Sequence, residues 1–204
     1  MWNESKGSIK TEEVYDVLDN ASLNISYSEI NDNDTDRNSV INLKGVNSSA
    51  VLNSASLVNK KKNYRIKMIN EGLRSSARIN NHAVVLENGK LMIDAIRKIN
   101  KGAKKAKSHQ TSRALSFSKG QNSTILPELL IDENDVEASH AMSIGRFDEN
   151  QLYYMMSRGL DMNECIKLIS LGYLMPIVDN IDNDELKSTL KDELERKIID
   201  LCMK

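Results

Sequence analysis

The chain has 204 residues, of which 40% are hydrophobic and 28% charged, and its formal net charge is −1. This balance is typical of a globular domain with a real core and does not fit a disordered or fibrous protein. Residues 1–10 are polar and no apolar run of about 18 residues occurs, so we expect neither a signal peptide nor a membrane span. The composition therefore predicts a cytoplasmic protein.

The charge is unevenly distributed along the chain. Residues 60–120 are rich in Lys and Arg, whereas the segments on both sides are rich in Asp and Glu. A basic segment can indicate a phosphate or nucleic-acid surface. Tyr64 and Phe117 are its only aromatic residues, so it lacks the stacking platforms of single-strand binders. A solvated surface, or charge matching within the chain or a complex, is favoured over nucleic-acid binding.

The first segment, residues 1–39, is expected to be a variable leader. Within it, Thr11–Leu18 could form one or two helical turns, with Thr11 as the N-cap. The polar run Asn31–Asp36 indicates a loop. Its acids lack the glycine and the distant Glu of a calcium-binding EF-hand loop.

Residues 40–147 have the pattern of a β-rich core. Short segments with β-branched residues recur, and turn residues separate them every 8–12 residues or so. No strict repeat of fixed length is visible. Gly102–Lys107 is ambiguous, because it has helical propensity but could also form an exposed strand. Periodicity alone does not distinguish a β-sandwich from a β-helix here.

The last segment, residues 148–204, has helical periodicity. Asp148 is expected to cap a helix that Gly159 ends, and Asp161 to cap a second helix that Pro176 bends or ends. Asp182 or Asp184 is expected to start a third helix with an apolar stripe. We therefore predict a β-rich body followed by a compact helical tail.

Few residues outside these patterns suggest chemistry. Cys165 and Cys202 lie far apart in the sequence, and we expect both to be small buried residues. His82 and His109 have no companion ligands at a recognisable spacing, so a structural role is favoured for each. The sequence contains no phosphate-binding Gly-x-x-x-x-Gly-Lys-Ser/Thr loop and no convincing catalytic constellation, so we predict that the chain is not an enzyme.

Residues 123–160 carry a specific resemblance. A Pro-x-Leu-x-Ile strand, an Asp-Val turn, a Ser-His-Ala motif, an Asp-x-x-Gln-Leu-x-Tyr motif and Ser-Arg-Gly follow one another in register. The matching residues are Pro127, Leu129, Ile131, Asp135, Val136, His140, Gly145, Asp148, Gln151, Leu152, Tyr154, Ser157, Arg158 and Gly159. This pattern resembles the C-terminal signature of the SufB/SufD family of iron–sulfur cluster assembly proteins. Convincing similarity covers about residues 70–180.

The resemblance implies a fold and partners. The fold would be a short right-handed parallel β-helix closed by C-terminal helices, and Gly102–Ser116 would then be strand. Family members dimerise through the β-helix, with a SufB-like subunit or a second copy as partner here, and bind SufC, an ABC-type ATPase, through the helices. Candidate docking residues on the predicted helices are Leu152, Tyr153, Met156, Arg158, Ile166 and Ile169.

His140 is the candidate iron ligand, because the family places its functional histidine in this motif and a neutral imidazole binds iron. SufB-type members have Glu after this histidine, where this chain has Ala141. They also carry a cysteine at a position that corresponds roughly to Ser118. The chain therefore resembles SufD, and we expect any iron–sulfur cluster to be transient and shared with a partner subunit.

The leading hypothesis is thus a scaffold subunit that docks a SufC-type ATPase and contributes His140 to a cluster at a subunit interface. Family members are commonly much longer than this chain, so only a few turns of the β-helix are expected. One alternative is a degenerate structural partner of the ATPase without a cluster site. Another is a β-helix enzyme that acts on polysaccharide, but the near absence of acids at residues 60–120 argues against it.

Overall fold

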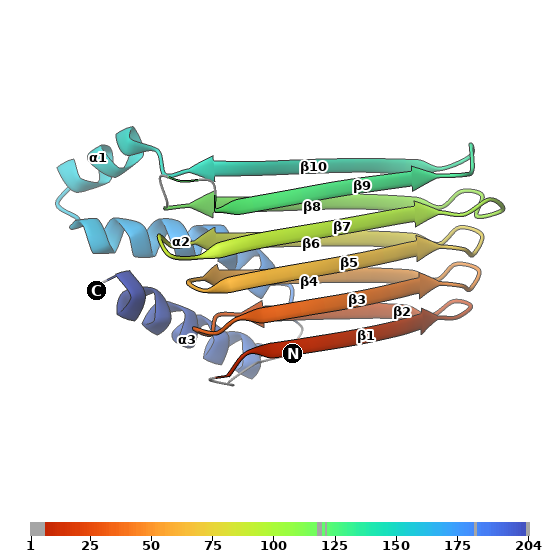
Figure 1. Ribbon diagram of the computed structural model, residues 1–204, viewed down its shortest axis with the longest axis horizontal. Helices are drawn as coiled ribbons and strands as arrows, with labels where there is room; N and C mark the ends of the chain where they lie inside the picture. The colour runs from red at the N-terminus through yellow and green to blue at the C-terminus, as the bar shows by residue number, and fades with distance from the viewer. Residues whose placement is uncertain (1–6, 118–119, 121, 182, 203–204) are drawn as a thin grey trace.

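A computed structural model describes residues 7–117, 120, 122–181 and 183–202. Ten strands and three helices follow one another along these residues (Figure 1). The strands are β1 (Ile9–Val17), β2 (Ser22–Glu29), β3 (Thr35–Leu43), β4 (Ser49–Val58), β5 (Lys61–Asn70), β6 (Ser76–Val85), β7 (Lys90–Ile99), β8 (Lys107–Ser116), β9 (Ser123–Ile131) and β10 (Glu137–Arg146). The helices are α1 (Glu149–Ser157), α2 (Met162–Val178) and α3 (Asp184–Cys202).

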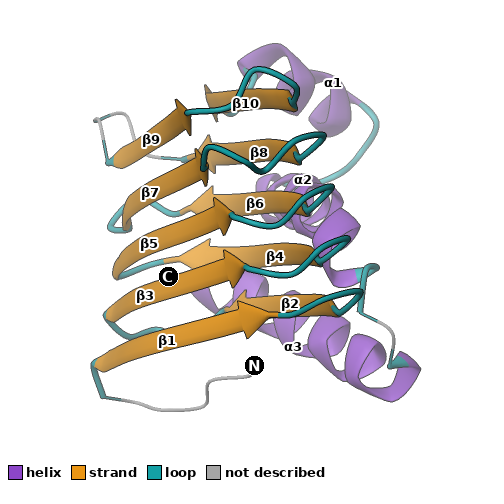
Figure 2. Ribbon diagram, turned by 90° about the vertical axis from the view of Figure 1, so that its right-hand side faces the viewer, coloured by secondary structure: helices purple, strands orange, loops and turns teal. Residues whose placement is uncertain are grey.

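The strands form a coil with two parallel sheets. Strands β1-β3-β5-β7-β9 make one five-stranded sheet and β10-β8-β6-β4-β2 the other, so each turn of the coil contributes one strand to each sheet (Figure 2). In Figure 1 the odd-numbered strands run to the right in front, and the even-numbered strands return behind them as the chain rises. The coil is therefore right-handed. The predicted parallel β-helix followed by helices is confirmed, and the sandwich alternative is wrong.

The turns of the coil reveal a repeat that the sequence pattern did not show. Ser22, Ser49 and Ser76 stand in register at intervals of 27 residues. Asn20, Asn47 and Arg74 follow the same interval and all adopt positive φ. Their side chains form a ladder, with Asn47 Nδ2 2.9 Å from Asn20 Oδ1 and Arg74 Nε 2.7 Å from Asn47 Oδ1. The interval lengthens in later turns, as in the pairing of Ser76 with Lys107, which hides the repeat from a search at fixed length.

The coil begins earlier than predicted. Residues 9–17 form strand β1, paired in parallel with β3, and β2 pairs with β4. The expected helical turns at Thr11–Leu18 are therefore wrong. In place of a leader that extends to residue 39, the described residues 7–39 contain β1, β2 and the start of β3. The side chains of β1 alternate between half-buried and exposed, which is the two-residue period of a strand. The predicted loop lies at Asn31–Asp34, and β3 already begins at Thr35.

The ambiguous segment at Gly102–Lys107 is mostly turn, and strand β8 begins at Lys107. Gly102 has φ +94° and Lys105 φ +58°, conformations that neither a helix nor a strand accommodates. The resemblance therefore predicted strand correctly only for Lys107–Ser116. The helical propensity of the lysines and alanines has no effect because the chain must reverse here.

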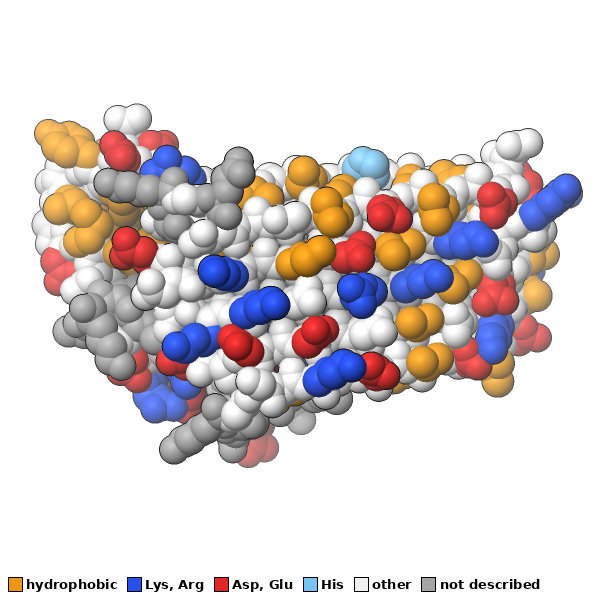
Figure 3. Space-filling model, in the orientation of Figure 1, with side chains coloured by type: hydrophobic (Ala, Val, Ile, Leu, Met, Phe, Trp, Pro, Cys, Tyr) orange, Lys and Arg blue, Asp and Glu red, His pale blue; other side chains and the backbone are white. Residues whose placement is uncertain are grey.

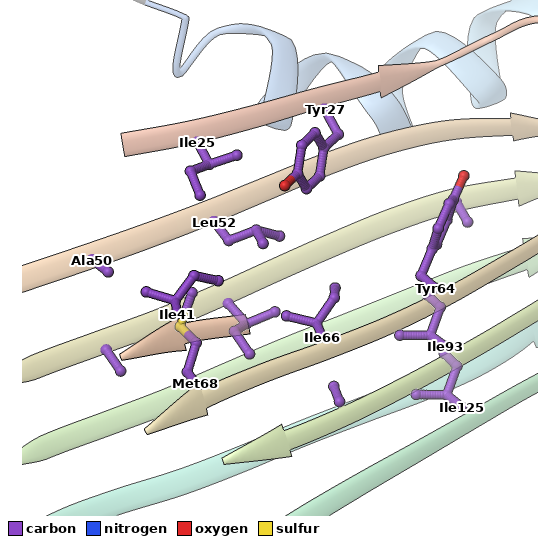
Figure 4. Packing of buried hydrophobic residues seen from close by; sticks show 14 of the residues in the cluster. Ile25, Tyr27, Ile41, Ala50, Leu52, Tyr64, Ile66, Met68, Ile93 and Ile125 are labelled. Carbon is purple, nitrogen blue, oxygen red and sulfur yellow. The ribbon is translucent and has the colours of Figure 1, made fainter. Parts of the chain in front are cut away.

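The interior of the coil is narrow and mainly aliphatic. Ile41, Leu52, Ile66 and Ile93 project from both sheets into one buried cluster (Figure 4). The scarcity of aromatic residues, 4% of the chain, fits this layered interior. Buried polar side chains also stack between turns, because Ser54 Oγ lies 2.6 Å from Asn81 Oδ1 and Asn81 Nδ2 lies 3.1 Å from Ser112 Oγ.

The helices pack against the outer face of the even-numbered sheet. Leu174 and Leu194, on α2 and α3, belong to one buried cluster with Leu57 of β4 and Val84 of β6. Asp148 caps α1 and Asp161 caps α2, as predicted. Helix α3 begins at Asp184, one of the two predicted starts, and Asn183 Oδ1 accepts a hydrogen bond from the Leu186 amide at 2.8 Å; Asp182 lies outside the described residues.

Pro176 lies inside α2, which ends two residues later at Val178. Among the described residues, the three helices are all too short or too polar to span a membrane.

Candidate functional site

The candidate site lies at the end of the coil formed by β9 and β10. His140 pairs in register with Gln110 of β8, whose side chain is buried and faces the interior. Paired residues of neighbouring strands project to the same face of a sheet, so His140 also faces inward. It is nevertheless exposed, since no further turn of the described chain stacks on β9 and β10. The predicted iron ligand is thus accessible at an open end.

Apolar side chains share this open end with His140. Ile131 of β9 and Met142 and Ile144 of β10 occupy inward-facing positions, yet they are 44%, 52% and 43% exposed. In every earlier turn such positions are covered by the next turn. β9 and β10 are also the edge strands of their sheets, with free backbone groups on one side. Exposed apolar side chains beside strand edges favour association with another chain.

Two side chains contact Ser139, the residue before His140. From inside the coil, Arg97 Nη1 donates to the carbonyl oxygen of Ser139 at 2.7 Å and to that of Ser108 at 3.2 Å. From outside, His109 Nδ1 lies 2.8 Å from Ser139 Oγ. These contacts fix β10 on its single neighbour, β8. His109 therefore has the structural contact expected of it.

The other predicted structural residues also have packing roles. His82, on the outer face of β6, places Nδ1 2.8 Å from the carbonyl oxygen of Tyr173 in α2. A carbonyl only accepts, so Nδ1 carries the proton. Burial lowers the pKa of His82, and the nearby Arg113 adds to this effect while the bond to Tyr173 opposes it. Cys165 is buried and free, as predicted, whereas the side chain of Cys202 lies outside the described residues.

The predicted docking residues divide into two groups. Tyr153 and Met156 of α1 are 76% and 43% exposed, and Arg158 is exposed beside them, with Nη2 3.2 Å from the Tyr154 hydroxyl. Leu152, Ile166 and Ile169 are half-buried, and Ile169 also lines a groove beside α1. The first group is therefore accessible to a partner, whereas the second is only partly accessible.

A groove of about 440 Å³ lies next to these helices, between α1, α2 and the end of the coil. Its lining is mainly apolar and includes Leu115, Phe147, Leu168 and Tyr173. Gly172 of α2 also lines it, and no atom lies within 4 Å of the position that a Cβ would take there. The groove is therefore open at Gly172.

The basic middle of the sequence does not form an uninterrupted basic surface. On the outer face of the odd-numbered sheet, Lys and Arg alternate with Asp and Glu (Figure 3). Neighbouring strands pair these charges, as in Arg65 with Asp94 at 3.6 Å and Lys98 with Asp132 at 3.7 Å. Charge matching within the chain, one of the alternatives considered from the sequence, accounts for these pairs.

Sequence reasoning missed the charged residues inside the coil. Arg37 is buried with Glu29 and Glu13, each 2.6 Å away, and Arg97 is buried as well. The signal for Arg97 was present, because Leu91, Ile93 and Ala95 alternate inward and place Arg97 on the same face. A charged residue in that position contradicts the usual pattern and so indicates a candidate functional residue.

No group of three or more His, Cys, Asp or Glu side chains in the described ranges is arranged to hold a metal ion. Ser118, which corresponds to the family cysteine, lies outside those ranges. Ligation of iron by His140 therefore stays a prediction from the sequence.

Comparison with known proteins gives consistent matches. Residues 1–173 match a family model described as "SUF system FeS cluster assembly, SufBD core domain". The iron-sulfur cluster assembly protein SufD of Bacillus subtilis is 39% identical over 136 residues, covering 67% of this chain and 31% of that protein. A SufBD family protein of Pyrococcus horikoshii is 31% identical over 107 residues, covering 52% of this chain and 22% of its own length. The chain thus spans about a third or less of these relatives.

Proposed function

Because the chain belongs to the SufB/SufD family of iron–sulfur cluster assembly proteins, we propose that it is a scaffold subunit that shares a cluster with a partner at the open end of its coil. His140 would supply one ligand to iron. A SufB-like subunit, or a second copy of this chain, would supply the others, including the soft thiolate. The cluster is cargo in this proposal, assembled at the interface and passed on.

One observation carries the proposal. His140 stands on the inward face of the last turn, exposed, on the same open end as Ile131, Met142 and Ile144. A partner that covers these apolar side chains would also enclose the imidazole and exclude water from it. Exclusion of water strengthens metal–ligand and electrostatic interactions, and it protects a reactive cluster from side reactions.

The second part of the proposal concerns the helices. We assign α1 and the adjacent groove as the docking surface for a SufC-type ATPase, with Tyr153, Met156 and Arg158 in direct contact. Aromatic residues, Met and Arg are enriched at the centres of protein interfaces. The ATPase would supply the ATP hydrolysis for which this sequence has no phosphate-binding loop.

The two alternatives are separated as follows. Membership of the family supports a scaffold role over a polysaccharide enzyme. A degenerate partner of the ATPase would bind it through α1 but would assemble no cluster at His140. Anaerobic reconstitution of the purified complex with iron and sulfide, followed by absorption spectroscopy, distinguishes that partner from a scaffold.

The coil-end interface is tested by a Met142→Asp/Ile144→Asp variant, which places two charges on the apolar end. We expect it to lose association with a co-expressed SufB-like subunit, measured by size-exclusion chromatography with light scattering. Val14→Asp is the matched control, because Val14 is also an exposed strand residue but lies on the outer face of β1. If both variants associate like the wild type, the coil end is not the interface.

A further inference from the structure

Arg97 is a buried cation without an anionic partner. Its side chain is fully buried on the inner face of β7, and no carboxylate of the described residues forms an ion pair with it. Arg37, the other fully buried arginine, is held by both Glu13 and Glu29. Burial lowers the pKa of Arg97 to about 10, which still leaves it charged at neutral pH. A charge inside a protein is costly unless an opposite charge accompanies it.

Polar atoms around Arg97 also lack partners. Within the described part of the chain, Arg97 Nε and Nη2 make no hydrogen bond, and neither do Ser108 Oγ and Gln110 Oε1 on the facing strand β8. Only Nη1 is satisfied, by the Ser108 and Ser139 carbonyl oxygens. Two donors of the guanidinium and one hydroxyl are therefore available to a guest. A water molecule could satisfy these hydrogen bonds but would leave the charge uncompensated.

From this arrangement we infer that Arg97 and Ser108 form an internal binding site for a small monovalent anion, of the size of hydrosulfide or a halide. Among the described residues, the donor atoms left free at this position are Arg97 Nε and Nη2 and Ser108 Oγ, which a small anion can engage together. Gln110 contributes its carbonyl oxygen to the same region, where it can orient the Ser108 hydroxyl or a protonated guest. The site lies below the last turn, because Gln110 is in register with His140.

The inference of this site depends on the burial of Arg97 and does not require the proposed function. Its connection to that function is the identity of the anion, because hydrosulfide is the form in which inorganic sulfide enters a cluster at neutral pH. A halide would occupy the same site without any role in cluster assembly. The two sources are distinguished by experiment.

The direct test uses crystals of the wild-type chain soaked in sodium bromide, with data collected at the bromine absorption edge. We expect an anomalous peak within hydrogen-bonding distance of Arg97 Nε or Nη2. Density that shows only a water molecule there, without anomalous signal, overturns the proposal. The bromide soak uses only the wild-type chain, so it tests for the anion site even if substitutions at Arg97 impair folding.

A solution test measures the Tm against bromide or hydrosulfide concentration, at constant ionic strength made up with gluconate. A hundredfold excess of anion over its Kd should raise the Tm of the wild type by roughly 5–10 °C. Arg97→Met should abolish this rise, and Arg97→Lys should weaken it. The surface variant Arg65→Met should retain it, since Arg65 is half exposed. Equal responses in wild type and Arg97→Met would refute the site.

The same titration separates this inference from the proposed function. A response to both anions supports the site and its connection to sulfide. A response to bromide alone supports the site and removes that connection, while the assembly role of His140 is tested independently.

Discussion

Arg37 Nη2 lies 2.6 Å from a carboxylate oxygen of Glu29, and both side chains are closed inside the first turns of the coil. The same guanidinium pairs with Glu13 at 2.6 Å and lies 4.0 Å above the ring of Tyr27. Two acids thus share one buried cation. Such an arrangement is stabilising only while every member is present.

Arg37→Met should therefore destabilise the protein strongly. The substitution leaves Glu29 buried without its partner, and loss of one member of a buried pair costs about 3–5 kcal/mol. Urea denaturation followed by circular dichroism measures the change in the free energy of unfolding. Lys44→Met is the control, because its pair with Asp16 is nearly half exposed and is expected to contribute little to stability. Similar losses in the two variants would contradict this account of the interior.

Acidification should weaken the attachment of α2 to the coil. Burial lowers the pKa of His82 below its ordinary value of 6.5, so the unfolded chain binds a proton that the folded chain resists. The contribution of neutral His82 to stability is complete above pH 6.5 and is lost as the pH falls through the lowered pKa. His82→Gln should remove this part of the pH dependence.

The measurement compares Tm values of wild type and His82→Gln between pH 7.5 and pH 5. His109→Gln serves as the control, since His109 lies on the coil surface away from α2 and contacts Ser139. We expect the wild type and the control to lose more stability on acidification than His82→Gln does. Parallel curves for all three proteins would show that His82 has no such role.

Tyr153→Asp should impair binding of a SufC-type ATPase with little effect on folding. Tyr153 is 76% exposed, so its replacement should change stability by no more than about 0.5 kcal/mol. An aromatic anchor at the centre of an interface typically contributes 2 kcal/mol or more, so affinity should fall by about thirtyfold. Isothermal titration calorimetry measures the affinity of each variant for the ATPase. Leu186→Asp, on α3, should bind normally; equal weakening by both variants would argue against α1 as the docking surface.

The sequence predicted the architecture well after residue 40 and poorly before it. The C-terminal motifs lie on strand and helix ends, where caps such as Asp148 and Asp161 leave clear local signals. In β1 the local signal is ambiguous, because Glu12 and Glu13 fit the first turn of a helix or a strand equally well. Pairing with β3 decides between them, and that contact is not local.

The candidate site was predictable only in part. The His140 motif indicated a functional position, but its exposure depends on what stacks on the last turn, which no local pattern encodes. Arg97 and Arg37 were not recognised because charged residues normally face solvent. Their burial follows from the alternation of inward and outward side chains on neighbouring strands, so it can be predicted once the register of the strands is known.

The central claim is that His140 ligates iron at the open end of the coil. The chain, labelled with ¹⁵N-histidine and reconstituted with its SufB-like partner under anaerobic conditions, should show ¹⁵N hyperfine coupling to the reduced cluster in pulsed electron paramagnetic resonance. The coupling should disappear in His140→Ala and persist in His109→Ala. A cluster that forms in His140→Ala with an unchanged ¹⁵N signal would contradict the claim.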